Sequence, residues 1–381
     1  MRALSLFSGC GGCDFALQDA GVTVAYANEI ADDACATLER YFPHAEIDRR
    51  DIRQIKSFPS ADLICGGYPC QSFSMGGNRD PEKDERTTLF REFARSLALV
   101  NPLYFIAENV SGLKKIDGGR FLLEQSETFR QCGVHGYRVS TQLLDAKDYG
   151  VPQSRKRVFL VGVRSDLQKV FKFPAKTHGV RSRKAPRLLP FTSHGECIRD
   201  LPLWPAGEFY ERPHDPEGHW SWYYMSRNRK AAWDGPSYTI VANWRHVTLH
   251  PGSPVMKMTW SDLANGWKQR WDFTDEYEHL AEDPSRPSLE APRRLSWREC
   301  ARIQGFPLGF EPIGDTESKY EQVGNAVPPL LFKKITEHLI SGVGLKPLNA
   351  ECDDFSEQLS DQLLFNAEAA IQPAESITHH L

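Results

Sequence analysis

A cysteine that directly follows a proline is the first candidate for chemistry in this chain. Cys70 comes after Pro69 and two glycines, and the apolar run 61–65 before them is typical of a buried parallel strand. Ligands of open α/β sheets bind at the carboxyl ends of the strands, so Cys70 is expected at that edge. A rigid, exposed thiol in this place is suited to act as a nucleophile. On this stretch alone, a buried structural cysteine is an equally good interpretation.

One acidic and two basic side chains are expected at the same edge of the sheet. The buried run 103–107 ends in Glu108, which would bring a carboxylate beside Cys70. Arg155 and Arg157 alternate at the start of a strand predicted over 158–163, so both guanidiniums would lie on one face. Paired guanidiniums indicate recognition of a phosphate or a carbonyl group, and a solvated strand start is the alternative.

The N-terminal segment has the pattern of a nucleotide-binding β-α-β unit. A strand predicted over 3–7 is followed by Gly9, Gly11 and Gly12, and then by a helix over 13–20 whose N-terminus would face a ligand. The glycines do not fit the G-x-G-x-x-G spacing, which makes a dinucleotide site the weaker interpretation.

Two acidic residues follow this glycine loop at spacings that favour a ligand site. Glu29 ends a second predicted strand roughly 20 residues after the loop, where an acid can bind ribose hydroxyls. Asp51 and Ile52 are expected to end a third short strand and to offer adenine a carboxylate beside an apolar surface. Plain surface acids are the alternative for both positions.

The alternation of strands and helices predicts an α/β fold with a doubly wound sheet, and it ceases near residue 164. Between 165 and 292 the chain is rich in tryptophan, tyrosine and proline, which indicates a second, smaller, irregular and β-leaning domain. Aromatic residues interleaved with basic ones fit a nucleic-acid surface, and they fit a small loop-rich core as well. On composition alone the loop-rich core is the safer interpretation.

The charge of the chain is unevenly distributed. The formal net charge is −4, but seven acidic residues and no lysine or arginine lie beyond residue 350, so the first 350 residues carry +3. The range 153–187 holds eleven lysines and arginines against one acid, Asp166, which suits phosphate binding or a solvated face. Nine irregularly spaced cysteines indicate a reducing cytoplasm and no metal site. We expect no membrane segment and no signal peptide, since apolar runs are short and a strand begins at once.

Six short motifs occur in an order that resembles the DNA (cytosine-5)-methyltransferases of bacterial restriction–modification systems. They span almost the whole chain apart from its tail, and they are Leu6-Phe7-Ser8-Gly9-x-Gly11-Gly12, Pro69-Cys70-Gln71-x-Phe73-Ser74, Glu108-Asn109-Val110, Gln153-x-Arg155-x-Arg157, Arg298-Glu299 and Gly324-Asn325-Ala326-Val327-Pro328-Pro329. The resemblance implies a methyltransferase (Rossmann-like) catalytic domain over 1–164 plus 315–345, a target-recognition domain over 165–314, and an acidic, mobile tail over 346–381.

The resemblance also implies roles for single residues. S-adenosyl-L-methionine would lie over the loop from Phe7 to Gly12, and its other contacts would be Glu29, Asp51, Ile52, Pro69, Asn325 and Val327. Cys70 would attack C6 of a cytosine flipped out of double-stranded DNA, and the loop over 75–88 would close on it. Glu108 would engage N3 and the exocyclic amine, and Arg157, supported by Arg155, would contact O2. The family further implies a monomer, a bacterial cytoplasm or nucleoid, and a cognate restriction endonuclease encoded nearby.

Three other functions stay open at this point. A tRNA cytosine-5 methyltransferase would share the motifs, but the region between Arg157 and Arg293 is long enough for reading a DNA groove. A catalytically inactive DNA-binding relative is disfavoured by the intact set Cys70, Glu108 and Arg157. A nicotinamide-dependent dehydrogenase does not agree with the glycine spacing. Tyr68 departs from the family pattern, in which proline is frequent at this position.

Overall fold

The computed structural model describes residues 1–69, 88–180, 187–209, 220–263, 266–277, 283 and 286–348. Cys70, nearly all of the predicted loop over 75–88 and the acidic tail beyond residue 348 therefore lie outside the described residues.

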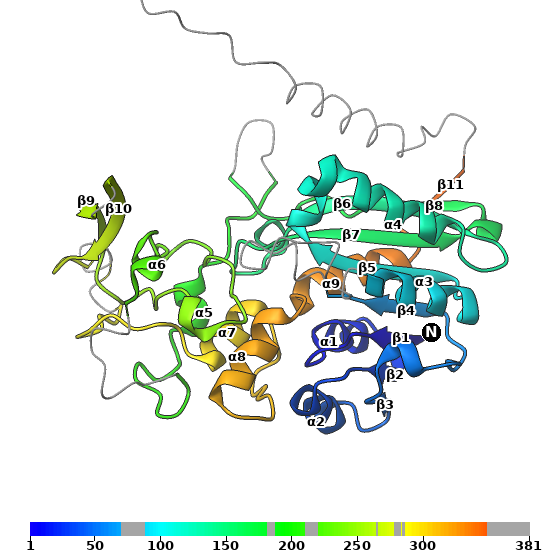
Figure 1. Cartoon of the computed structure of the whole chain (residues 1–381), viewed down its shortest axis with the longest axis horizontal. Coiled ribbons are helices and arrows are strands. Elements are labelled where there is room, and N and C mark those ends of the chain that lie inside the picture. Colours follow the sequence, from blue (N-terminus) through cyan, green and yellow to red (C-terminus); the bar gives the residue numbers. More distant parts are fainter. Residues whose placement is uncertain are drawn as a thin grey trace, which may run out of the picture.

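A seven-stranded sheet forms the centre of the larger part of the molecule (Figure 1). Its strand order is β3-β2-β1-β4-β5-β7-β6. The neighbours from β3 to β5 are parallel, and β7 is antiparallel to both β5 and β6. The strands are β1 (Arg2–Leu6), β2 (Thr23–Asn28), β3 (Glu46–Asp48), β4 (Leu63–Gly66), β5 (Tyr104–Val110), β6 (Tyr137–Asp145) and β7 (Lys156–Arg164).

Helices cover both faces of this sheet because its central strands are apolar on both sides. Cys65 and Ile106 belong to the core on one face, whereas their neighbours Ile64 and Phe105 belong to the core on the other. The first core includes α1 (Gly12–Asp19) and α9 (Pro329–Ile340), and the second includes α3 (Leu89–Val100) and α4 (Arg120–Arg130). The predicted doubly wound α/β sheet is confirmed.

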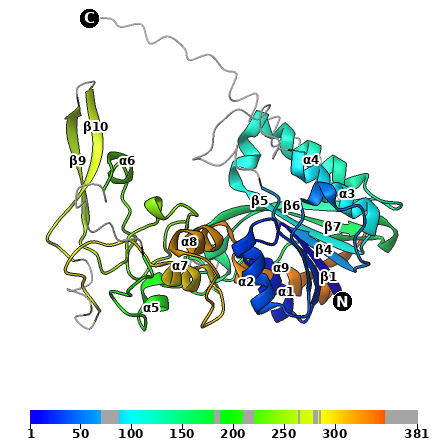
Figure 2. The ribbon, with the colours of Figure 1, turned by 60° about the horizontal axis from the view of Figure 1, so that its bottom comes forward.

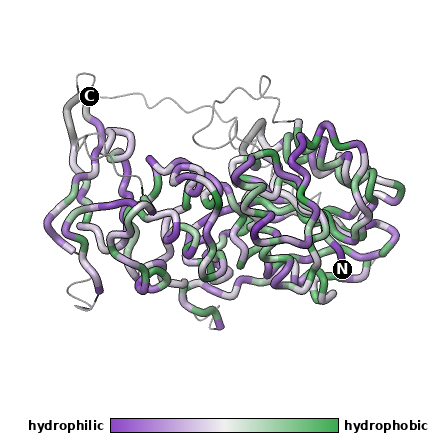
Figure 3. Tube along the Cα trace, turned by 90° about the horizontal axis from the view of Figure 1, so that it is seen from below, coloured by the Kyte–Doolittle hydropathy of each residue, from purple (hydrophilic) through white to green (hydrophobic). Residues whose placement is uncertain are grey.

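The rest of the chain forms a smaller, irregular part beside the carboxyl edge of the sheet (Figures 1 and 2). Its regular elements are α5 (His194–Ile198), α6 (Trp222–Met225), β9 (Met256–Leu263), β10 (Gly266–Phe273), α7 (Trp297–Gln304) and α8 (Thr316–Asn325). The antiparallel hairpin β9–β10 lies at the end farthest from the sheet (Figure 2). Hydrophobic stretches run mainly through the part that holds the N-terminus (Figure 3).

A shared apolar cluster joins the two parts. Phe15 of α1 and Leu38 of α2 (Asp32–Tyr41) pack in the same cluster as Trp297 and Cys300 of α7. Ser296 caps α7 and forms a reciprocal capping box with Glu299, as the sequence predicts. Because this contact is apolar and continuous, the smaller part is held firmly against the loops of the sheet.

Several predicted boundaries differ from the structure. The third strand ends at Asp48, not at Asp51-Ile52, because Asp51 instead accepts a hydrogen bond from the Arg53 amide and caps the 3₁₀ turn η1 (Ile52–Gln54). The loop predicted from Gln322 starts later, since α8 continues to Asn325.

Strand β8 (Lys169–Phe171) follows the predicted domain boundary at residue 164, yet it belongs spatially to the large part. It pairs with β11 (Leu345–Pro347), and Phe171 lies in the core that includes α9. Further 3₁₀ turns are η5 (Ser111–Gly119), η6 (Ala146–Tyr149), η7 (Ser165–Leu167) and η8 (Trp244–His246).

Candidate active site

A cavity of about 880 Å³ opens at the carboxyl edge of the parallel strands. Every predicted site residue within the described part of the chain lines it except Gly11; these are Phe7, Gly9, Gly12, Glu29, Asp51, Ile52, Pro69, Glu108, Arg155, Arg157, Asn325 and Val327. Residues from the first strand, the middle strands and the penultimate helix therefore meet in one place, which is where ligands of such sheets bind.

The glycine loop and Glu29 form one end of this cavity. The Glu29 carboxylate accepts hydrogen bonds from the backbone amides of Gly9 (2.8 Å), Ile30 (2.8 Å) and Ala31 (3.0 Å). A carboxylate has about four acceptor positions, so one remains for a ligand hydroxyl. Phe7 has a left-handed backbone with φ of 54°, a conformation that costs roughly 1–3 kcal/mol and is concentrated at functional sites.

Two of the loop glycines have packing roles. A Cβ atom at Gly12 would lie 2.5 Å from the carbonyl oxygen of Val327, so only glycine lets α1 approach the segment after α8. A Cβ atom at Gly11 would lie 2.7 Å from the ring of Phe42, so Gly11 faces α2 and not the cavity.

Asp51 and Ile52 lie on the opposite wall of the same end. Ile52 is buried, and its carbonyl oxygen accepts a hydrogen bond from Arg95 of α3. Asp51 forms an ion pair of 2.7 Å with Arg53, and this hydrogen-bonded pairing lowers the pKa of the Asp51 carboxyl. An apolar side chain and an ionised carboxylate thus lie next to each other.

Glu108 and Arg157 face each other at the other end of the cavity. Arg157 of β7 lies opposite Val110 of β5, two residues along the strand from Glu108, and Arg157 Nε lies 2.9 Å from Glu108 Oε1. Both side chains are largely buried. Burial raises the pKa of Glu108, and the charges of Arg157 and Arg155 oppose that shift only in part. The carboxyl group can therefore hold a proton at a higher pH than an exposed glutamate.

Arg155 has a different environment from Arg157, although both line the cavity. Its guanidinium is almost fully buried and donates to the backbone oxygens of Ile240 (2.7 Å), Gly324 (2.9 Å) and Ala326 (3.0 Å). Arg155 therefore ties the start of strand β7 to Ile240 and to the end of α8, and it acts on Glu108 through its charge.

Tyr68, the departure from the family pattern, is buried beside the site. Its hydroxyl donates to Gln125 Oε1 of α4 at 2.6 Å, and its carbonyl oxygen accepts from Asn109 Nδ2 at 3.3 Å. The phenol hydroxyl is thus bonded to α4, Tyr68 also lines the cavity, and its backbone helps to hold the segment that leads to Pro69.

The sequence did not reveal one wall of the cavity. Residues 239–242 of the smaller part line it, and Thr239 Oγ1 donates to the carbonyl oxygen of Ser154 at 2.7 Å. No motif marks this segment, because its position depends on buried hydrogen bonds between distant parts of the chain. Within the described ranges, no cluster of histidine, cysteine and carboxylate side chains could hold a metal ion. The same ranges contain no helix long and apolar enough to cross a bilayer.

Comparison with known proteins gives a family for this chain. The model of the C-5 cytosine-specific DNA methylase family matches residues 1–341. The Type II methyltransferase M.BsuRI of Bacillus subtilis is 37% identical over 374 residues, covering 88% of this chain and 78% of the relative. M.FnuDI of Fusobacterium nucleatum is 36% identical over 350 residues, covering 89% and 95% respectively.

Solved structures agree on the fold. The Dnmt2 methyltransferase of S. pombe has a TM-score of 0.58 at 17% identity, with 90% of this chain and 99% of that chain covered. The methyltransferase EhMeth of Entamoeba histolytica has a TM-score of 0.60 at 14% identity, with 90% and 98% covered. The predicted family is thereby confirmed, and the dehydrogenase alternative is wrong. The sheet and the cavity at its carboxyl edge agree with the family match over residues 1–341. This chain therefore belongs to the C-5 cytosine-specific DNA methylases and is a DNA (cytosine-5-)-methyltransferase.

Proposed function

We propose that the cavity binds S-adenosyl-L-methionine at its glycine-loop end and a flipped-out cytosine at its Glu108 end. One observation carries this proposal: the nucleotide-type loop and the buried Glu108–Arg157 pair line a single cavity. Such a cavity brings a methyl donor and an acceptor base within one enclosed site, which is what a direct transfer requires.

The cofactor end has the chemistry that an adenosyl group needs. Glu29 keeps an acceptor position for ribose hydroxyls, and Ile52 with Asp51 offers adenine an apolar face and a carboxylate. Phe7, Gly9, Gly12, Pro69, Asn325 and Val327 complete the lining, while Gly11 acts through packing against α2. Bound there, S-adenosyl-L-methionine supplies an electrophilic methyl group.

The base end would activate the cytosine ring. A protonated Glu108 can donate to N3 and its carbonyl oxygen can accept from the exocyclic amine, while Arg157 can donate to O2. Arg155 would hold Arg157's strand in place through its three carbonyl contacts. Because these groups line a cavity, the target base must leave the duplex to reach them.

Cys70 is proposed as the nucleophile, since it follows Pro69 in the sequence and Pro69 lines the cavity. Its thiolate would form a bond to C6, which places electron density on C5 and makes that carbon able to accept the methyl group. A base would then remove the C5 proton, and the C6–sulfur bond would break to restore the thiolate and the aromatic ring.

We infer that the target-recognition domain predicted over 165–314 recognises a specific sequence in double-stranded DNA. We further propose that the enzyme protects DNA in a restriction–modification system, since relatives such as M.BsuRI and M.FnuDI are named Type II methyltransferases. A cognate endonuclease encoded nearby, a monomeric enzyme and a location in the bacterial cytoplasm or nucleoid belong to this proposal.

The decisive experiment replaces Cys70 by alanine and measures transfer of labelled methyl from S-adenosyl-L-methionine to unmethylated duplex DNA. We expect Cys70→Ala to lose transfer while it still binds DNA and cofactor. Cys197→Ala, at a partly buried thiol in the smaller part, is the matched control and should keep transfer. Bisulfite sequencing of the wild-type product would give the methylated site. Methylation by Cys70→Ala at the wild-type rate would refute the covalent role, and label in tRNA alone would refute the DNA substrate.

A further inference from the structure

One exposed arginine closely follows a segment of the cavity wall in the sequence. Residues 239–242 line the cavity, and Arg245 comes three residues after Ala242. Three residues span at most about 11 Å. Successive base pairs are about 3.4 Å apart, so this reach corresponds to about three base pairs along a duplex.

The backbone of Arg245 is held rigidly. The side chain of Asn243 accepts a hydrogen bond from the Arg245 amide at 2.9 Å and caps the short turn η8. Trp244 is buried in the cluster that joins the two parts of the molecule. Arg294 Nε donates to the carbonyl oxygen of Arg245 at 3.2 Å. A side chain on such a support can be aimed at a ligand without a large loss of entropy.

The surface around Arg245 is strongly positive. Burial lowers the pKa of His246, and the charges of Arg229, Arg294, Arg245 and Arg227 lower it further, in that order. Across the residues that the structure describes, no carboxylate forms a salt bridge with Arg227, Arg229 or Arg245. Positive charge without acidic partners favours a polyanion such as DNA.

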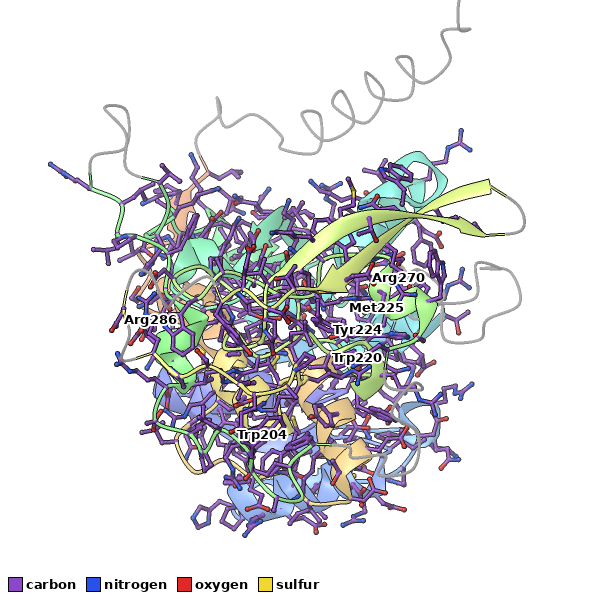
Figure 4. All side chains as sticks on the ribbon, turned by 90° about the vertical axis from the view of Figure 1, so that its left-hand side faces the viewer. Trp204, Trp220, Tyr224, Met225, Arg270 and Arg286 are labelled. Atoms are coloured by element: carbon purple, nitrogen blue, oxygen red, sulfur yellow. The ribbon has the colours of Figure 1, made fainter. Side chains whose placement is uncertain are left out.

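Two of these arginines support the surface from within. Arg229 donates to the carbonyl oxygen of Tyr224 at 3.0 Å, and Arg294 lies 4.4 Å from the centre of the Tyr224 ring. Tyr224 packs beside Trp220 and Met225 beneath the hairpin β9–β10 (Figure 4). These contacts hold both guanidiniums on the aromatic cluster.

Arg245 differs from these two because its side chain is exposed and only stacks, 5.2 Å from the centre of the Trp244 ring. Its guanidinium makes no hydrogen bond within the described ranges, so its donors are accessible to a ligand. Stacking holds the planar fork in one orientation, and this fork matches the O6 and N7 acceptors of guanine in the major groove.

We propose that Arg245 determines sequence specificity by donating to O6 and N7 of a guanine within about three base pairs of the target cytosine. This inference rests on the proposed function, since it takes the occupant of the cavity to be a base from duplex DNA.

The test compares wild type, Arg245→Gln and Arg130→Gln on a library of duplexes with randomised sequence, read out by bisulfite sequencing. Arg130 is the last residue of α4 and is far from residues 239–245 in the sequence. It pairs with Glu127 at the surface, and Arg130→Gln removes one positive charge, as Arg245→Gln does. We expect wild type and Arg130→Gln to require the same guanine. Arg245→Gln should still transfer methyl groups, but its preference for guanine at that position should fall about 5- to 150-fold.

The wild-type arm of a second measurement does not depend on the folding of any variant. Replacing that guanine by 7-deazaguanine removes N7, so it should lower methylation by the wild type and leave Arg245→Gln nearly unaffected. A uniform loss over all sequences in Arg245→Gln would overturn the proposal in favour of a phosphate contact. An unchanged sequence profile, or a wild-type site with no guanine within three base pairs, would also overturn it. Failure of the wild type to methylate any duplex would overturn the proposed function with it.

Discussion

At the scale of single residues, burial decides how each charged group behaves. Glu108 and Arg157 are close enough to form an ion pair, yet burial still raises the pKa of Glu108. Asp14 in the first turn of α1 is a stronger case, since its pKa rises to about 7 although a helix N-terminus favours a carboxylate. Desolvation therefore outweighs the helix dipole at this position.

Asp14 leads to a prediction about stability and pH. Its Oδ2 accepts from Ser5 Oγ at 3.1 Å, and its Oδ1 has no hydrogen-bond partner in the described structure. Between pH 4 and pH 7 the Asp14 carboxyl group is ionised in the unfolded chain, whereas it is still protonated in the folded chain. Stability from this group is therefore complete below about pH 4 and is lost as the pH rises through 7. Between pH 5 and pH 8, the free energy of unfolding of Asp14→Asn should therefore rise by about 2 kcal/mol relative to that of the wild type.

Denaturant titration at several pH values measures that difference directly. Asp19→Asn, at the exposed end of the same helix, serves as the control for losing one carboxylate from α1. A difference between Asp14→Asn and wild type that stays constant from pH 5 to pH 8 would show that Asp14 is already ionised in the folded protein.

At the scale of secondary structure, the site depends on how closely α1 approaches the segment after α8. A Cβ atom at Gly12 would meet the Val327 carbonyl oxygen at 2.5 Å, and backbone cannot move aside as a flexible side chain can. We expect Gly12→Ala to shift residues 326–327, to weaken cofactor binding at least tenfold, and to cost about 1–3 kcal/mol of stability. Calorimetric titration with S-adenosyl-L-methionine measures the first effect.

Gly21→Ala separates this packing effect from backbone strain. Gly21 has φ of 79° at the other end of α1, with nothing within 4 Å of an added Cβ. Its replacement should cost about 1–2 kcal/mol of stability and leave cofactor affinity unchanged. Equal cofactor affinity in Gly12→Ala and wild type would contradict the close approach.

The secondary structure also shows what the sequence could and could not predict. The glycine loop, Glu29 and Glu108 could be placed because hydrophobic strands end at known residues and parallel strands end at one edge. The third strand was predicted about three residues too long, since Asp51 looks like a strand end but caps a turn. Residues 239–242 and the cavity wall they form could not be predicted, because buried partners as distant in sequence as Ser154 and Arg155 fix them.

At the scale of the whole molecule, a few buried polar side chains connect the large and small parts. Gln153 accepts from the Ile240 amide at 2.8 Å and donates to Gln304 Oε1 at 2.8 Å, and Gln304 donates to the Val323 carbonyl oxygen. Arg155 bonds to the same two regions. Because each bond is buried, a movement of residues 239–242 must also move the end of α8, which lines the cavity.

This connection predicts different outcomes for Arg155, just before β7, and Arg157 within it. Arg155→Met removes the donor of three buried carbonyl oxygens, so it should lower the free energy of unfolding by about 3 kcal/mol. Arg157→Met removes the ion-pair partner of Glu108, but burial already raises the pKa of this carboxyl group and favours its protonated, neutral form. We therefore expect it to cost only about 1 kcal/mol of stability but to abolish methyl transfer.

Denaturant unfolding and methyl-transfer assays on both variants separate a residue that holds the two parts together from one that contacts the base. Arg155 directly precedes β7, Arg157 lies within it, and both have the same side chain, so each serves as the matched control for the other. If Arg157→Met destabilised the enzyme as strongly as Arg155→Met, the Glu108–Arg157 pair would be chiefly structural. If Arg155→Met kept full stability, its three carbonyl contacts would contribute little to holding the two parts together.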